Sequence, residues 1–164
     1  MKTLLIVQYS RTGATRQMAE AVRRGAKRAE PNLMVRLADA READADDLLA
    51  ADGVVFATPE MLAGIAGLMK DFFERSYYGA LGRIEGRPYA ILVCAGSDGA
   101  NAVRQVERIA TGWRLKAIAE PIIVNTHAQT PEAILAAKIV PERELARGED
   151  LGAAFAAGLM MGVF

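Results

Sequence analysis

The sequence predicts an α/β domain built on a parallel sheet with helices on both faces. Apolar runs alternate with helical patterns along all 164 residues, and 52% of the residues are hydrophobic, enough to fill a substantial core. Strands that alternate with helices form parallel sheets, because each helix carries the chain back to the start of the next strand. We therefore expect one domain over residues 1–164, with no linker, low-complexity tract or internal repeat.

Five segments carry strand patterns and differ in expected burial. Continuous apolar runs, typical of strands covered on both faces, occupy residues 3–8, 53–58 and 89–94. The segment 33–37 alternates apolar and polar residues, and the segment 117–124 contains Pro121, so both belong at sheet edges. Three central and two edge strands fit the order 2-1-3-4-5 of doubly wound sheets.

Helical spacing of apolar residues predicts the elements between these strands. Helices are expected at residues 14–29, 44–51, 65–77, 99–113 and 142–161. Residues 125–141 show no such spacing and are expected to form a long loop. The apolar stretch 151–164 is interpreted as a buried last helix, with a subunit interface as the alternative.

Composition excludes several classes of protein. Twenty basic residues balance twenty acidic ones, which argues against a nucleic-acid partner. The single cysteine, Cys94, cannot form an internal disulfide, and with the lone His127 it leaves too few ligands for a zinc site, so no metal is expected. No apolar run reaches the roughly 20 residues that cross a bilayer, so we expect no membrane association and a cytoplasmic protein.

A loop suited to a phosphate follows the first strand. It consists of Ser10, Arg11, Thr12, Gly13, Ala14 and Thr15. The N–H groups and the dipole of a helix N-terminus favour a dianion, and Gly13 allows a close approach of the backbone. An ordinary helix cap needs one hydroxyl, whereas three lie within six positions here. The glycine and lysine patterns of triphosphatase and dinucleotide loops are absent.

Two further loops leave the same edge of the predicted sheet. Residues 58–67 are unusually apolar, which favours contact with a flat ligand, although a loop packed under the next helix is equally consistent. Residues 94–100 contain two glycines, which free N–H groups for a ligand or simply permit a tight turn. Three or four hydrogen bonds to a phosphate contribute roughly 5–10 kcal/mol against an association cost of about 4–15 kcal/mol. A mononucleotide with a large aromatic ring would supply the remainder by apolar burial.

These loops resemble those of flavodoxin-like proteins, in the branch of NAD(P)H-dependent FMN reductases and quinone reductases. The resemblance rests on residues 10–15, 57–75 and 94–99. It implies that residues 10–15 hold the phosphate of FMN. It also implies that the ring is lined near N5 by Thr58, Pro59, Glu60, Met61 and Leu62. Donors to the pyrimidine edge would come from Ala95, Gly96, Ser97, Asp98 and Gly99.

The chain departs from the electron-carrier flavodoxins in two ways. Those carriers place aromatic side chains on both faces of the ring, where this chain has Met61, Leu62, Ser97 and Asp98. They are also strongly acidic, and this chain is neutral. Both departures favour an enzyme in which FMN passes electrons from NAD(P)H to a quinone or similar small acceptor, with no catalytic side chain required.

Two more residues are candidates for the substrate pocket. The resemblance implies that Tyr77 or Tyr78 can reach the flavin, in some relatives across a subunit boundary; the alternative is that each tyrosine simply packs at the end of its helix. The Tyr77-Tyr78 segment and the apolar C-terminal helix are compatible with a homodimer or homotetramer. His127 follows the fifth strand and can lie at the pocket rim or simply on the surface. Two alternative functions stay open: an electron-transfer flavodoxin without direct NAD(P)H oxidation, and a flavin-free regulatory or binding module.

Overall fold

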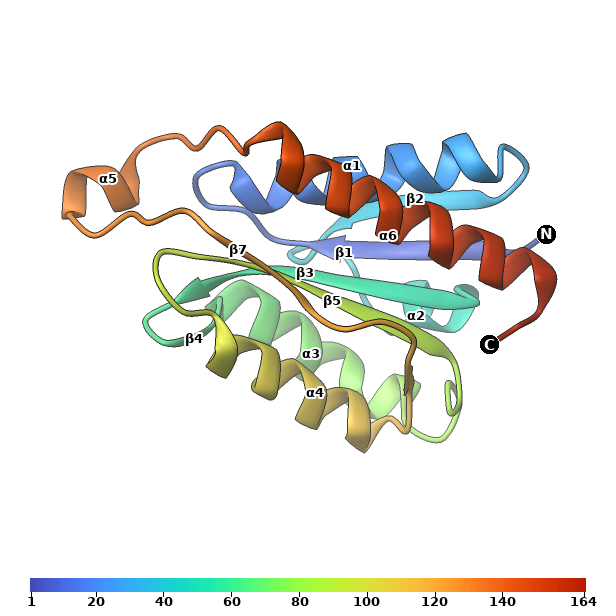
Figure 1. Ribbon diagram of the computed structural model, residues 1–164. Helices are drawn as coiled ribbons and strands as arrows, with labels where there is room; N and C mark the ends of the chain where they lie inside the picture. The colour runs from blue at the N-terminus through green and yellow to red at the C-terminus, as the bar shows by residue number, and fades with distance from the viewer.

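The computed structural model describes all 164 residues and confirms the doubly wound sheet (Figure 1). Its parallel strands, in spatial order, are β2 (Met34–Asp39), β1 (Thr3–Gln8), β3 (Gly53–Met61) and β5 (Pro88–Ala95), followed at the outer edge of β5 by β6 (Lys116–Ala117) and β7 (Ile122–Asn125). The expected fifth strand is thus split around Pro121, which has no N–H to give to the ladder. The order 2-1-3-4-5 is confirmed, with its last strand in two pieces.

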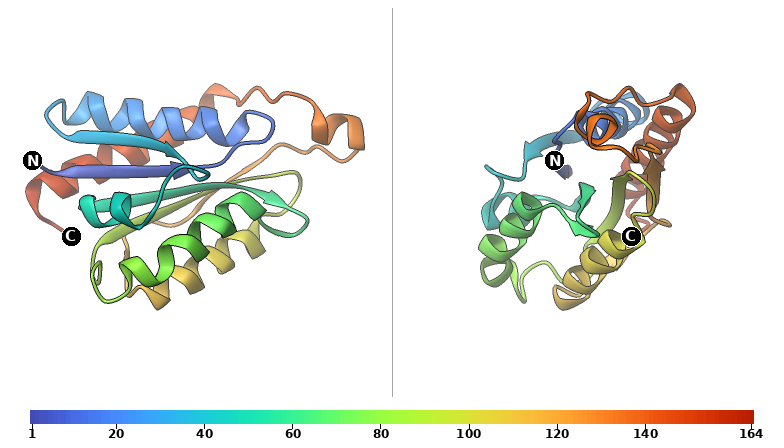
Figure 2. Two further views of the ribbon diagram at one scale, coloured as in Figure 1. Left: turned by 180° about the vertical axis from the view of Figure 1, so that it is seen from behind. Right: turned by 90° about the vertical axis from the view of Figure 1, so that its left-hand side faces the viewer.

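Helices cover both faces of the sheet, as Figures 1 and 2 show. One face carries α1 (Ala14–Ala29) and α6 (Glu142–Met161). The other carries α2 (Ala45–Ala50), α3 (Gly67–Ala80) and α4 (Ala100–Gly112). No helix has the length and apolar character needed to cross a membrane.

Two apolar cores follow from the alternation of side chains along the strands. In β1, Leu5 and Val7 face the core under α2, α3 and α4, which also contains Phe56 and Trp113. The neighbouring Leu4 and Ile6 face the core under α1 and α6, together with Phe155. Packing on both faces holds the sheet rigid, so its carboxyl edge presents the loops in fixed positions.

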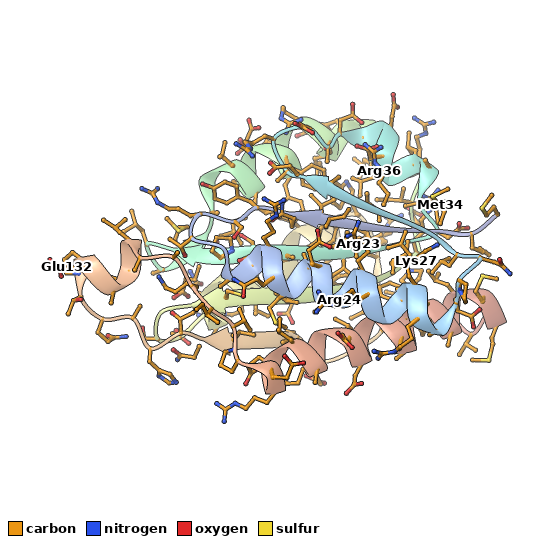
Figure 3. The ribbon with its side chains drawn as sticks, turned by 90° about the horizontal axis from the view of Figure 1, so that it is seen from above. Arg23, Arg24, Lys27, Met34, Arg36 and Glu132 are labelled. Atoms are coloured by element: carbon orange, nitrogen blue, oxygen red, sulfur yellow. The ribbon has the colours of Figure 1, made fainter.

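Helices α1 and α6 approach each other through small residues. A Cβ atom on Gly25 would collide with the backbone of Glu149, and one on Gly152 would collide with the carbonyl of Val22. The charged face of α1, with Arg23, Arg24 and Lys27, stays outside (Figure 3). Arg24 forms an ion pair with Glu149 of α6. Leu151, Phe155 and Leu159 of α6 are buried, which confirms the last helix as a core element, while the final residues after Met161 are largely exposed.

The structure differs from the sequence prediction in two loops. The apolar segment after β3 is a β-hairpin, because β3 extends to Met61 and pairs with the antiparallel strand β4 (Gly64–Ile65). Ile65 therefore belongs to β4, and α3 begins at Gly67. The expected long loop contains a short helix, α5 (Pro131–Leu135), which projects beyond the carboxyl ends of the strands (Figure 1).

Candidate functional site

The three predicted loops meet at the carboxyl edge of the sheet around a cavity of about 310 Å³. This volume is at the low end of the range for small-ligand sites. The structure brings together about half of the residues predicted for the cofactor: Arg11, Thr12, Ala14, Glu60, Met61, Leu62, Ala95 and Gly96.

The loop between β1 and α1 presents backbone donors that nothing in the chain satisfies. Gly13 is the N-cap of α1, with a φ of 101°, no side-chain cap and no acidic residue in the first turn. Ser10 Oγ accepts the N–H of Gly13 at 3.1 Å and so shapes the turn. No acceptor within the chain is bonded to the N–H groups of Arg11, Thr12, Ala14, Thr15 or Arg16. These donors and the positive end of the helix dipole make the loop a strong site for an anion.

Thr15 and Cys94 form the floor beneath this loop. Thr15 is only 1% exposed. Burial raises the pKa of the Cys94 thiol to about 12, and a hydrogen bond with Thr15 counters only part of this effect. The thiol is therefore protonated at neutral pH and is no nucleophile, even though Cys94 lines the cavity.

The β3–β4 hairpin forms the second wall of the cavity. Its turn residues Leu62 and Ala63 have φ values of 48° and 65°, a left-handed conformation that costs a non-glycine residue about 1–2 kcal/mol. Contacts with α4 hold the turn: Gln105 Oε1 accepts the N–H of Ile65 at 2.8 Å, and Asn101 donates to the carbonyl of Ala63. The Leu62 side chain is fully exposed at the mouth of the cavity.

Glu60 connects the hairpin to the loop that precedes α4. Its carboxylate accepts the N–H of Gly99 at 2.9 Å, so one donor predicted for the pyrimidine edge is already engaged. The N–H groups of Gly96, Ser97 and Asp98 have no acceptor within the chain and remain available to a ligand. The second and third loops are thus joined by a charged hydrogen bond.

Several predicted residues do not line the cavity. Ser10, Gly13, Thr15, Ser97, Asp98 and Gly99 belong to its loops without lining it, and Pro59 lies in β3. Thr58 is fully buried, and its hydroxyl accepts the N–H of Ala66 at 3.3 Å, which ties the hairpin to the start of α3.

The two residues predicted for the substrate pocket are also placed elsewhere. Tyr78 lies on the exposed side of α3, in a separate depression with Lys70 and Ile109, so it does not reach the cavity of its own chain. His127 is exposed and has a φ of 55°. It lines a neighbouring depression that shares Lys138 with the main cavity.

The sequence prediction missed six lining residues, five of them beyond β7. The six are Cys94, Thr126, Ala128, Ile134, Leu135 and Lys138. Thr130, Pro131 and Glu132 form a helix-start signal that could have revealed α5, and Thr130 Oγ1 indeed accepts the N–H of Ala133 at 3.2 Å. No local pattern indicates that Lys138, just after this helix, bonds the first loop at Thr12.

Comparison with solved structures places the chain in the flavodoxin-like class of folds. A flavodoxin from the domain Archaea superposes with a TM-score of 0.78 at 16% identity, covering 96% of this chain and 99% of that one. A WrbA-like flavodoxin from Agrobacterium tumefaciens gives a TM-score of 0.74 at 18% identity, over 98% and 99% of the two chains.

Sequence comparison then gives the family. The chain belongs to the NADPH-dependent FMN reductase family, which matches residues 1–130. A flavodoxin of Aquifex aeolicus (strain VF5) is 35% identical over 98 residues. That match spans 60% of this chain but only 50% of the relative, so the chain aligns with about half of that protein's length.

Proposed function

We propose that the chain is a flavoprotein oxidoreductase that binds FMN in the cavity at the carboxyl edge of the sheet. The main support is the set of N–H groups at the start of α1 that have no acceptor within the chain, in a loop whose residues Arg11, Thr12 and Ala14 line the cavity. Membership of the FMN reductase family supports FMN as the ligand. A phosphate monoester supplies the acceptor oxygens and the negative charge that these donors lack.

The remaining walls fit the other parts of FMN. Met61, Leu62 and Ala95 offer apolar surface to a planar ring, and the free N–H groups of Gly96 and Ser97 can meet its polar edge. No aromatic side chain lines the cavity. A ring held here would keep one face open, which suits a site where a second substrate must approach the flavin.

The proposed reaction takes electrons from NAD(P)H to a quinone or a similar small acceptor. FMN, when bound, supplies the transfer of hydride and electrons between the two substrates. The chain binds the phosphate, orients the ring and excludes water from its buried edge. Donors near the pyrimidine edge favour the reduced ring, because they stabilise the negative charge that reduction places there.

Titration of the purified protein tests the cofactor and the reaction in one series. We expect flavin absorbance or, for the apoprotein, quenching of FMN fluorescence and a rise in Tm as FMN is added. Anaerobic NADPH and NADH should bleach the bound flavin, and a quinone should restore its colour over many turnovers. A protein that gains no stability from FMN would contradict the proposal and favour the flavin-free module.

An electron-transfer flavodoxin is the second candidate, and the 35% identity to a flavodoxin favours it. Such a carrier would bind FMN equally well but would react slowly with NAD(P)H. Bleaching by dithionite without turnover on NADPH and quinone would select the carrier over the reductase.

A further inference from the structure

We propose that residues 126–140, here called the α5 segment, form a further wall of the FMN site in which Lys138 supplies a fixed positive charge for the phosphate. This inference rests on the FMN binding proposed above. Most of the α5 segment lies beyond residue 130, where the match to the family ends.

Hydrogen bonds join the α5 segment directly to the predicted phosphate loop. The N–H of Lys138 donates to the carbonyl of Thr12 at 2.8 Å. The Gln17 side-chain amide makes two hydrogen bonds to the backbone near the end of the segment. Its Nε2 donates to the carbonyl of Lys138 at 2.7 Å, and its Oε1 accepts the N–H of Val140 at 3.0 Å. The same Nε2 also donates to the carbonyl of Gly13 at 3.0 Å. Four hydrogen bonds, three of them made by Gln17, therefore connect the loop and α1 with the α5 segment.

The Lys138 ammonium is held in place by the end of α5. Its Nζ donates to the carbonyls of Ala133, Ile134 and Ala136, at 2.7, 3.0 and 2.5 Å. All three of its protons are thereby used, so it acts on a ligand as a fixed charge and not through a direct hydrogen bond.

Two cations, Lys138 and Arg11, line the cavity. Glu60 is the one acidic side chain there, and its carboxylate is already bonded to the N–H of Gly99. A doubly charged phosphate at the start of α1 would thus lie in a positive field from both the helix and the α5 segment.

The apolar residues of α5 are in position to cover a ligand. Helix α5 buries none of its residues, and Ile134 and Leu135 remain 49% and 62% exposed while lining the cavity. Glu132 marks the outer end of the helix, away from the body of the molecule (Figure 3). The helix is thus held by its anchors at Gln17 and Thr12, and contact with a ligand would bury its apolar surface.

Comparison of FMN with riboflavin tests the role of Lys138, because riboflavin lacks the phosphate. We expect Lys138→Met to raise the Kd for FMN about tenfold, while the Kd for riboflavin changes less than twofold. The loss should shrink at high salt. Lys138→Arg should restore most of the FMN affinity. Lys116→Met is the matched control, since Lys116 lies in β6 beside the amino end of β5 and should change neither Kd.

The positioning role of Gln17 has its own readout. Gln17→Met removes the bonds to the carbonyl of Lys138 and to the N–H of Val140, while the bond from Lys138 to Thr12 remains. Amide hydrogen exchange in the α5 segment should therefore speed up, and FMN should bind more weakly. In the wild type, FMN should slow exchange at Ile134 and Leu135.

Four outcomes would overturn the proposal. If Lys138→Met leaves the FMN affinity unchanged, or weakens the binding of FMN and riboflavin equally, the charge of Lys138 does not act on the phosphate. If FMN does not change amide hydrogen exchange in the α5 segment, this segment is not part of the FMN site. Failure of the wild type to bind FMN would instead overturn the proposed function, and this inference with it.

Discussion

Gly13 is the residue at which the phosphate loop can be tested most directly, by the substitution Gly13→Ala. A Cβ at this position has space, since the nearest atom outside its neighbours, Gln17 Nε2, would be 3.4 Å away. The cost comes from the backbone, because a φ of 101° is unfavourable for alanine by about 1–2 kcal/mol. For a domain of this size, that cost should lower Tm by about 2–8 °C.

Relief of this strain should also rotate the peptide unit between residues 13 and 14, whose N–H is one of the open donors. Each lost hydrogen bond to a charged group is worth about 1.5–3 kcal/mol, so the Kd for FMN should rise about tenfold or more. Fluorescence titration with FMN measures this change, and riboflavin should show a smaller one.

Gly82→Ala is the matched control for Gly13→Ala. Gly82 has a φ of 74° and no atom within 4 Å of its would-be Cβ. It should therefore lose a similar amount of stability without losing FMN affinity. If Gly13→Ala lowers Tm as expected and still binds FMN like the wild type, the amides at the start of α1 do not hold the phosphate.

Three other substitutions probe the thiol, the loop connection and the helix contact. Because burial raises the pKa of Cys94 from 9.0 to about 12, the stability that its protonated form contributes is complete below pH 9 and is lost as pH rises toward 12. Urea unfolding should therefore show a steeper loss above pH 9 in the wild type than in Cys94→Ala. Glu60→Ala should speed amide hydrogen exchange at Gly99 about tenfold or more, because the N–H of Gly99 loses its acceptor. Glu60→Gln keeps an acceptor and should change the exchange rate less. Equal exchange rates in the two variants would show that this hydrogen bond does not protect Gly99. Gly152→Ala should separate α6 from α1 and cost about 1–3 kcal/mol, while Gly67→Ala, whose Cβ meets nothing within 4 Å, should leave Tm nearly unchanged.

The regular elements could be predicted from the sequence because their signals are local. The apolar spacing of residues 14–29 gave both ends of α1 as observed, and the interruption at Pro121 indicated an edge strand that the structure splits in two. The loop predicted to bind phosphate could also be recognised in the sequence, since its hydroxyls and Gly13 are neighbours in the chain.

The hairpin after β3 escaped prediction for a physical reason. Leu62 and Ala63 adopt left-handed conformations that their residue types disfavour, and hydrogen bonds with Gln105 and Asn101 of α4 help to hold the turn in this shape. Such a turn has no signature in its own residues, because its stability comes from a distant helix.

The sequence alone determined the sheet, its strand order and the loop that we predict to bind an anion, because periodicity and turn chemistry act between neighbours. Tertiary structure decided what surrounds that loop. Gln17 meets residues 138–140 across more than 120 positions, and Glu60 meets Gly99 across 39. These contacts form only after the packed sheet has brought the carboxyl ends of its strands to one edge. No pattern in the sequence around Gln17 or Glu60 indicates which distant residue each of them will contact.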